Sequence, residues 1–301
     1  MNVINSEADD SGRITDEQGV IYSSDGTYLL WNANHRLTEY TVKPGTKFIR
    51  RGAFCDCKSL ESIIIPDSVT EIGEAAFMGC DSLQRVEIPE SVTEIRDKTF
   101  KLCKALRSIN LPASLTSIDC YAFTECQTLR ELVIPEGVTS IGDGAFMQCG
   151  SLRHLILPKT LRLLGDNPFA CCPELQLEIA DGADYKLLNG LLIDKKGKLV
   201  SSLSKLPEII IPDLVKAIGN GAFYGCRTIR SIILSNSVTV IEDDAFLYCE
   251  ELRCVTIPTS VTGIGYRAFY GCENLQSVQV PKSVTTIGYH AFPEECEIIQ
   301  V

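Results

Sequence analysis

Residues 72–94 read IGEAAFMGCDSLQRVEIPESVTE, and residues 141–163 repeat the same skeleton as IGDGAFMQCGSLRHLILPKTLRL. Isoleucine or leucine heads such a block every 23 residues, first over residues 49–164 and again over residues 218–287. Each block is a version of I-G-x-x-A-F-x-x-C-x-x-L-x-x-I-x-I-P-x-x-V-T-x, and the chain holds ten of them. A fixed period of about 20 to 50 residues is typical of proteins whose units stack side by side.

The spacing within one unit predicts two extended segments. At the end of residues 83–88 the apolar side chains alternate, which indicates a half-buried strand, and the proline that usually follows ends that strand. The β-branched V-T-x-I-G stretch predicts a second short strand and a glycine-assisted turn. The A-F-x-x-C turn places Phe and Cys inside. One unit cannot bury this apolar face alone, so we expect successive strands to pair in parallel along a solenoid.

These motifs resemble the BspA-like leucine-rich repeat family, over residues 49–179 and 218–299. The resemblance implies a β-rich, right-handed superhelical solenoid with a parallel strand on its concave face. It also implies a role in adhesion or protein recognition, rather than catalysis, on a bacterial or protozoan surface. The family therefore predicts a cell-surface or secreted protein. In contrast, the absence of a recognisable signal peptide and the many unpaired cysteines predict a cytoplasmic one if Met1 is the native start.

Two segments, residues 19–48 and 190–217, break the period and resemble each other. Each predicts a β-hairpin, because Asp25-Gly26 and Lys196-Gly197 are turn residues between apolar segments. The second segment is a candidate position for a bend. We expect five parts: a flexible acidic N-terminus at 1–18, a hairpin cap at 19–48, repeats one to six at 49–180, a hairpin-containing variant repeat at 181–217, and repeats seven to ten at 218–301.

Charge and hydropathy exclude two classes of partner. The net charge of −11 argues against nucleic acid, whose binders usually carry a basic stripe. No run of apolar residues approaches the length of a membrane-spanning segment, so we expect no membrane insertion.

The 14 cysteines raise the question of metal, disulfides or packing. Because nine of them occupy one slot of the repeat, we predict an inward ladder of small apolar side chains. There is no C-x-x-C motif and no flanking histidine, so we expect neither a metal nor any other cofactor. The nine are Cys57, Cys80, Cys103, Cys126, Cys149, Cys172, Cys226, Cys249 and Cys272.

Catalysis has little support in the sequence. The three histidines, His35, His154 and His290, are far apart and lack a local nucleophile motif. Glu131 and His154 hold the same slot of successive repeats, which favours an incidental cross-strand contact over a catalytic base with its orienting partner. We therefore predict a protein that is not an enzyme.

The outward positions of the x-I-x-I strand vary while the buried ones barely change. Apolar residues stand at several of these outward positions among polar neighbours, a pattern that often marks a protein interface. Two alternatives stay open: β-branched residues suit any strand, and a hairpin could cover them. The predicted ligand-binding residues are Arg85, Glu87, Asn110, Glu131, Val133, His154, Ile156, Ser231, Ile233 and Thr256.

The sequence thus favours a scaffold that binds a protein ligand, such as a host or matrix protein, through this strand face. A glycan ligand is the second hypothesis, since Trp31 and scattered tyrosines offer surfaces on which sugars stack. A third is self-association into homo-oligomers through the C-terminal end, EIIQV at 297–301, where the last repeat has no recognisable cap.

Overall fold

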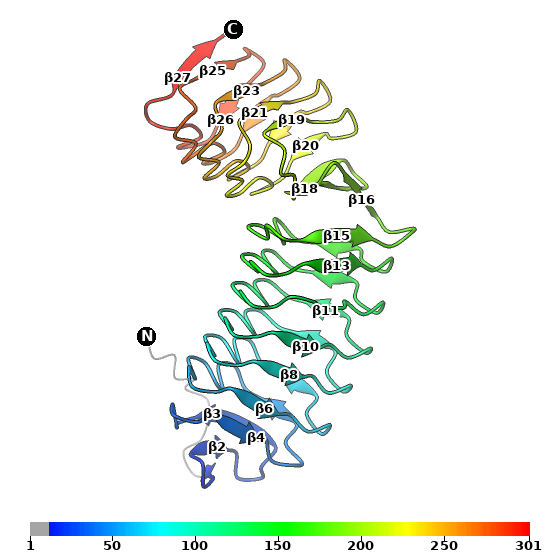
Figure 1. Ribbon diagram of the computed structural model, residues 1–301, viewed down its shortest axis with the longest axis vertical. Coiled ribbons are helices and arrows are strands. Elements are labelled where there is room, and N and C mark those ends of the chain that lie inside the picture. Colours follow the sequence, from blue (N-terminus) through cyan, green and yellow to red (C-terminus); the bar gives the residue numbers. More distant parts are fainter. Residues whose placement is uncertain (1–11) are drawn as a thin grey trace.

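Most turns of the chain contribute two short strands to a stacked solenoid (Figure 1), and the turn at Glu131 makes only a single bridge on one side. The computed structural model describes residues 12–301, which form about 12 turns and contain no helix. Strands of neighbouring turns pair in parallel and in the register of one repeat, so that Ile109 lies opposite Val86. The predicted fold class, a β-rich solenoid, is confirmed. The two turns beyond the ten predicted repeats come from the segments after the two hairpins.

The strands form two walls. The A wall carries the x-I-x-I strands: β4 (Glu39–Thr41), β6 (Ser62–Ile64), β8 (Arg85–Glu87), β10 (Ser108–Asn110), β13 (His154–Leu157), β15 (Gln176–Ile179), β19 (Glu208–Ile210), β21 (Ser231–Ile233), β23 (Cys254–Thr256), β25 (Ser277–Val280) and β27 (Glu297–Gln300). The B wall carries β5 (Phe48–Ile49), β7 (Glu71–Ile72), β9 (Glu94–Ile95), β11 (Ser117–Ile118), β12 (Ser140–Ile141), β14 (Leu163–Leu164), β20 (Ala217–Ile218), β22 (Val240–Ile241), β24 (Gly263–Ile264) and β26 (Thr286–Ile287).

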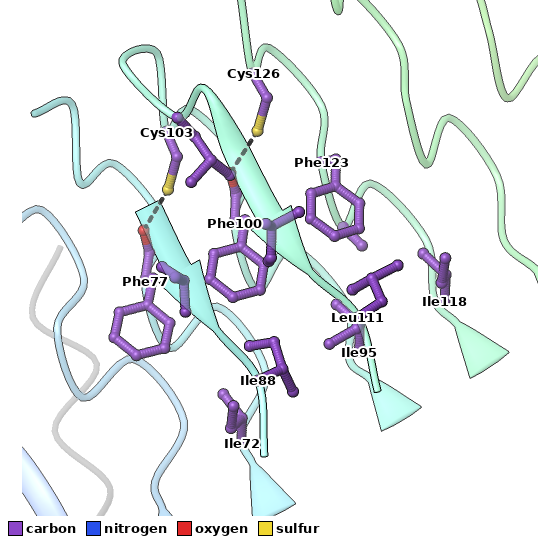
Figure 2. Close-up of a cluster of buried hydrophobic side chains, with 14 of the residues drawn as sticks. Ile72, Phe77, Ile88, Ile95, Phe100, Cys103, Leu111, Ile118, Phe123 and Cys126 are labelled. Atoms are coloured by element: carbon purple, nitrogen blue, oxygen red, sulfur yellow. Dashed lines mark hydrogen bonds between the residues drawn. The ribbon is translucent and has the colours of Figure 1, made fainter. Parts of the chain in front are cut away.

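A ladder of phenylalanine rings fills the space between the walls (Figure 2). From Phe54 to Phe169 consecutive rings stack with centroids 5.4 to 5.8 Å apart. From Phe223 to Phe292 the spacing is 4.8 to 5.2 Å. Because each ring packs on its neighbour in the next turn, the ladder couples successive turns into one core.

The cysteine slot forms a second ladder, which lies inside as predicted except at Cys226, which is half-buried. The structure adds a role that the sequence did not indicate, since these thiols also donate hydrogen bonds. The Sγ atoms of Cys103 and Cys126 lie 3.2 Å from the carbonyl oxygens of Phe77 and Phe100, one turn earlier (Figure 2). Five further thiols make the same contact: Cys80, Cys149, Cys172, Cys249 and Cys272. The thiol therefore satisfies a buried carbonyl as well as filling space.

Both predicted hairpins are present, and each contributes to three antiparallel strands at the end of a larger B-wall sheet, of five strands for the first and seven for the second. The first comprises β1 (Ile14–Thr15), β2 (Val20–Tyr22) and β3 (Tyr28–Asn32), and the second comprises β16 (Tyr185–Leu188), β17 (Leu191–Asp194) and β18 (Lys198–Ser202). Gly26 and Gly197 have φ angles of 71° and 89°, as their turns require. The five-part division stays a prediction. Residues 1–11 of its first part lie outside the described residues.

The second hairpin divides the solenoid into two halves, residues 12–184 and 185–301. Its strands join the B wall of the C-terminal half, and no strand pairing links β15 to β19. Buried apolar side chains separate into two clusters that meet near Leu191 and Leu192. The stacking direction changes there (Figure 1). Neither internal ladder therefore runs unbroken through the solenoid.

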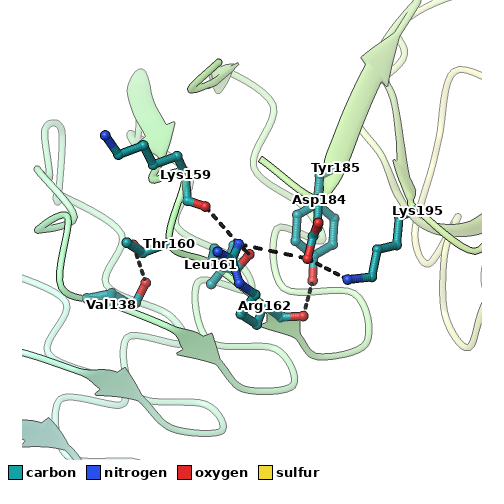
Figure 3. A network of polar contacts seen from close by, with 8 residues as sticks. All are labelled: Val138, Lys159, Thr160, Leu161, Arg162, Asp184, Tyr185 and Lys195. Carbon is teal, nitrogen blue, oxygen red and sulfur yellow. Dashed lines mark hydrogen bonds and ion pairs between the residues drawn. The ribbon is translucent and has the colours of Figure 1, made fainter. Parts of the chain in front are cut away.

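Polar contacts tie the two halves together. Lys198 Nζ lies 2.8 Å from Asp166 Oδ1 in the N-terminal half and 2.7 Å from Glu242 Oε2 in its own half. Figure 3 shows a second group of polar contacts between the halves. There Asp184 accepts from Lys195 at 2.7 Å and faces Arg162 at 3.8 Å.

Candidate binding face

The A wall presents a row of outward side chains over a buried row, because successive residues of a strand point to opposite faces. On β8, Val86 is buried while Arg85 and Glu87 on either side are exposed. The same alternation recurs on β6, β10 and β23. All ten predicted binding residues stand in outward slots of this wall.

Seven of the ten predicted residues belong to the N-terminal half. Arg85, Glu87 and Asn110 lie on β8 and β10, which pair with each other. Glu131 forms a backbone bridge to His154 at the start of β13, so these two occupy neighbouring turns as predicted. Val133 and Ile156 follow two residues later along the same two turns.

Two exposed apolar side chains dominate the middle of this face. Val133 is 82% exposed and Ile156 is 44% exposed, and they hold the same slot of successive turns. Because both side chains are exposed, neither hairpin covers them, and the alternative that a hairpin buries these two residues is wrong. Ile64, 63% exposed, holds the same slot three turns earlier.

Charged side chains lie on both sides of the apolar pair along the wall, with Glu178 opposite Ile156 and with Arg85 and Glu87 two turns before Val133. Arg85 and Glu87 form an ion pair of 2.6 Å within one strand. The ring of His154 lies 3.0 Å from Glu178 Oε1 on the next turn, so its side-chain partner is Glu178 rather than Glu131. The position in the repeat does not tell which carboxylate contacts His154, because Glu131 lies one turn before it and Glu178 one turn after it.

The remaining three predicted residues form a separate surface. Ser231, Ile233 and Thr256 lie on β21 and β23, in a sheet of the C-terminal half that also contains β19. Ile210 on β19, 74% exposed, lies opposite Ile233, 46% exposed. Ile210 is not among the ten predicted residues, because its repeat is irregular. The structure thus distributes the predicted residues over two faces.

The repeat model described as the BspA type leucine-rich repeat region matches residues 47–176 and 200–301, in six copies. The chain belongs to the BspA-type leucine-rich repeat family. Its predicted membership is thereby confirmed. Among curated proteins, none matches the sequence significantly.

Several solved structures share this solenoid. A leucine-rich cell surface protein from Faecalibacterium prausnitzii is 27% identical, with a TM-score of 0.70 over 95% of this chain and 87% of that one. A leucine-rich repeat protein from Bacteroides ovatus is also 27% identical, with a TM-score of 0.53 over 96% and 88%. The pneumococcal vaccine antigen PcpA is 20% identical and has a TM-score of 0.69 over 93% and 78%, which shows the fold alone.

Other features of this BspA-type chain offer little chemistry. Within residues 12–301 no group of three or more His, Cys, Asp and Glu side chains is placed to hold a metal ion. The same residues include no helix long and apolar enough to cross a membrane. Two shallow depressions of about 370 and 360 Å³ lie over the B wall. Ion pairs already engage Lys198 beside the first and Arg96 beside the second.

Proposed function

We propose that this BspA-type protein is a recognition scaffold that binds a protein ligand through the outward A-wall face of its N-terminal half. The exposed pair Val133 and Ile156 carries the proposal. An apolar pair of this exposure, set among charged side chains, resembles the apolar centre and polar rim of a protein interface.

The fold supports the same function. Buried slots are fixed by the Phe and Cys ladders, whereas outward slots do not contribute to the core and can change without unfolding the chain. A rigid face of this kind loses little conformational entropy on binding. The Faecalibacterium relative is described as a cell surface protein, which accords with adhesion as the biological setting.

A capture experiment tests this proposal. The native chain and a Val133→Glu/Ile156→Glu variant would be immobilised and exposed to extracellular-matrix proteins and cell lysate. Captured proteins would be identified by mass spectrometry, then purified for affinity measurement. We expect the variant to bind the identified protein at least tenfold more weakly, because a charge in an apolar interface is left unpaired.

Two matched variants locate the surface. Ser117→Glu/Ser140→Glu places the same two charges on paired B-wall strands and should bind normally. Ile210→Glu/Ile233→Glu charges the A wall of the C-terminal half. Loss of binding only in this second variant would contradict the N-terminal face as the site. Circular dichroism and melting of each variant would exclude unfolding as the cause.

Self-association is a second candidate function, favoured by β27. All four of its residues are exposed, and among residues 12–301 it pairs only with β25. Ile298 and Ile299 are 49% and 40% exposed on this strand. Sedimentation velocity at increasing concentration would show oligomers that Ile299→Lys abolishes. A monomer at all concentrations would contradict this function.

A further inference from the structure

The tyrosines that are scattered in the sequence gather on one edge of the C-terminal half. Five of the ten tyrosines lie between residues 224 and 289, in the turns that lead from the B wall back to the A wall. The ring centroids of Tyr224, Tyr248, Tyr270 and His290 follow one another at 6.0, 6.1 and 6.1 Å, each in a T-shaped contact. We call these four residues, together with Tyr266 and Tyr289, the tyrosine stripe.

Most of the stripe is open to solvent. Tyr248, Tyr266 and Tyr270 are 41%, 42% and 38% exposed, and Tyr289 is 74% exposed. The fold does not require these residues. In the N-terminal half the slot of Tyr224 and Tyr270 holds Met78, Lys101, Thr124 and Met147.

Contacts with a glycine and an arginine hold the rings in place. A Cβ atom on Gly271 would lie 2.4 Å from Cδ1 of Tyr248, so the Tyr248 ring lies directly over this glycine. The Arg267 guanidinium lies 5.5 and 5.3 Å from the ring centroids of Tyr266 and Tyr270. These contacts hold the rings in place before any ligand arrives, which lowers the entropy cost of binding.

The charge around the stripe disfavours an anionic ligand. Arg267 is paired with Asp244 at 3.5 Å. Glu250 and Glu273 come two and three residues after Tyr248 and Tyr270, and the whole chain carries a net charge of −11. Acidic polysaccharides, nucleic acids and acidic peptides would therefore be repelled.

We propose that the tyrosine stripe binds a linear, uncharged glycan along the axis of the C-terminal half. The C–H groups on one face of a pyranose pack against the electron-rich face of a tyrosine ring, while the sugar hydroxyls can bond to the phenol oxygens. The stripe places one aromatic ring per turn at steps of 6.0 to 6.1 Å, and because successive rings are nearly perpendicular, alternate rings can turn their faces toward a linear chain of sugars. A polyproline helix turns only every ~9 Å and does not match this step.

The test uses oligosaccharides of defined chemistry. Cellohexaose and chitohexaose would be titrated against the full chain by calorimetry, and an array of neutral and acidic glycans would extend the range. We expect binding of a neutral linear glycan that weakens at least tenfold in Tyr248→Ala/Tyr270→Ala. Tyr121→Ala, which removes an exposed tyrosine from the corresponding turn of the N-terminal half, should bind as the native chain does.

Several outcomes would overturn the inference. The inference fails if no neutral glycan on the array binds, or if only acidic glycans bind. It also fails if binding survives Tyr248→Ala/Tyr270→Ala, or if a proline-rich peptide binds and sugar does not. This test is independent of the proposed function. The Val133→Glu/Ile156→Glu variant should lose its protein ligand and still bind the glycan, so either proposal can fail alone.

Discussion

The thiol of Cys103 donates a hydrogen bond of 3.2 Å to the main-chain carbonyl of Phe77, one turn earlier in the solenoid (Figure 2). Both residues are fully buried. The ring of Phe77 also stacks on Phe100, three residues before Cys103, with centroids 5.4 Å apart. The same two turns are therefore joined by a ring contact and a thiol contact, and the repeat copies this arrangement along each half.

Cys103→Ala should destabilise the N-terminal half by about 1 to 3 kcal/mol. It leaves the Phe77 carbonyl without its donor and opens a small cavity beside the ring ladder. Urea unfolding followed by circular dichroism would measure the change. Cys254→Ala is the control, because Cys254 is exposed and its removal should change the free energy of unfolding by less than about 0.5 kcal/mol. Equal effects of the two substitutions would contradict a stabilising role for the thiol ladder.

The two halves should unfold as separate units. Their buried clusters are distinct, except that Tyr185 and Leu192 of the second hairpin belong to the N-terminal cluster. The ring ladder has no stacked pair between Phe169 and Phe223 among the contacts of residues 12–301. In a solenoid, stability is transmitted through contacts between neighbouring turns, so a weak interface divides the transition. Phe123→Ala and Phe246→Ala should each lower the stability of one half by about 3 to 5 kcal/mol.

Hydrogen exchange with mass spectrometry in rising denaturant would follow both halves in one sample. We expect Phe123→Ala to advance exchange in the N-terminal half alone and Phe246→Ala to advance it in the C-terminal half alone. Exchange that rises together across the whole chain in both variants would contradict separate unfolding and show that the two halves are one cooperative unit.

Much of the architecture could be predicted from local pattern. Alternation in the x-I-x-I segment fixes which side chains are buried, and a strict period fixes the register, since Val86 and Ile109 must face the same interior. The hairpin at residues 190–202 was also predictable from Lys196-Gly197. The sequence also made this segment a candidate position for a bend, but it did not predict that both internal ladders stop there, because whether a hairpin caps a stack or divides it depends on contacts between distant turns.

The candidate sites were less predictable. Tyr224 and Tyr248 occupy different slots of their repeats, so a search by period does not bring them together, although their rings touch in the structure. The side-chain partner of His154 likewise depends on rotamers rather than on slots. The sequence showed which positions point outward. It did not show that the ten predicted binding residues are divided between the A walls of the two halves.

The 14 cysteines should react at very different rates. Burial raises the pKa of Cys172 to about 12 and raises that of Cys103 still further, so these thiols stay protonated and shielded at pH 8. Only Cys171 and Cys254 are exposed, and burial of its sulfur raises the pKa of Cys171. Titration with a chromogenic disulfide should therefore show a fast phase that Cys254→Ser removes, and all thiols should react once the chain is unfolded. Rapid reaction of the ladder thiols in the native chain would contradict their burial.

Asp25 should make the first hairpin sensitive to acid. Its carboxylate accepts from Ser23 Oγ at 2.6 Å and from the Thr27 amide at 3.0 Å, and the pKa of Asp25 is lowered to about 2, chiefly by the Ser23 bond. An unfolded Asp titrates near 3.9, so this contribution to stability is complete above about pH 4 and is lost as pH falls towards 2.

The native chain should be more stable than Asp25→Asn at pH 7, and this difference should shrink across that window. Thermal midpoints at several pH values would measure it, with Asp67→Asn, an exposed aspartate, as the control. A difference that stays constant down to pH 2 would contradict the lowered pKa.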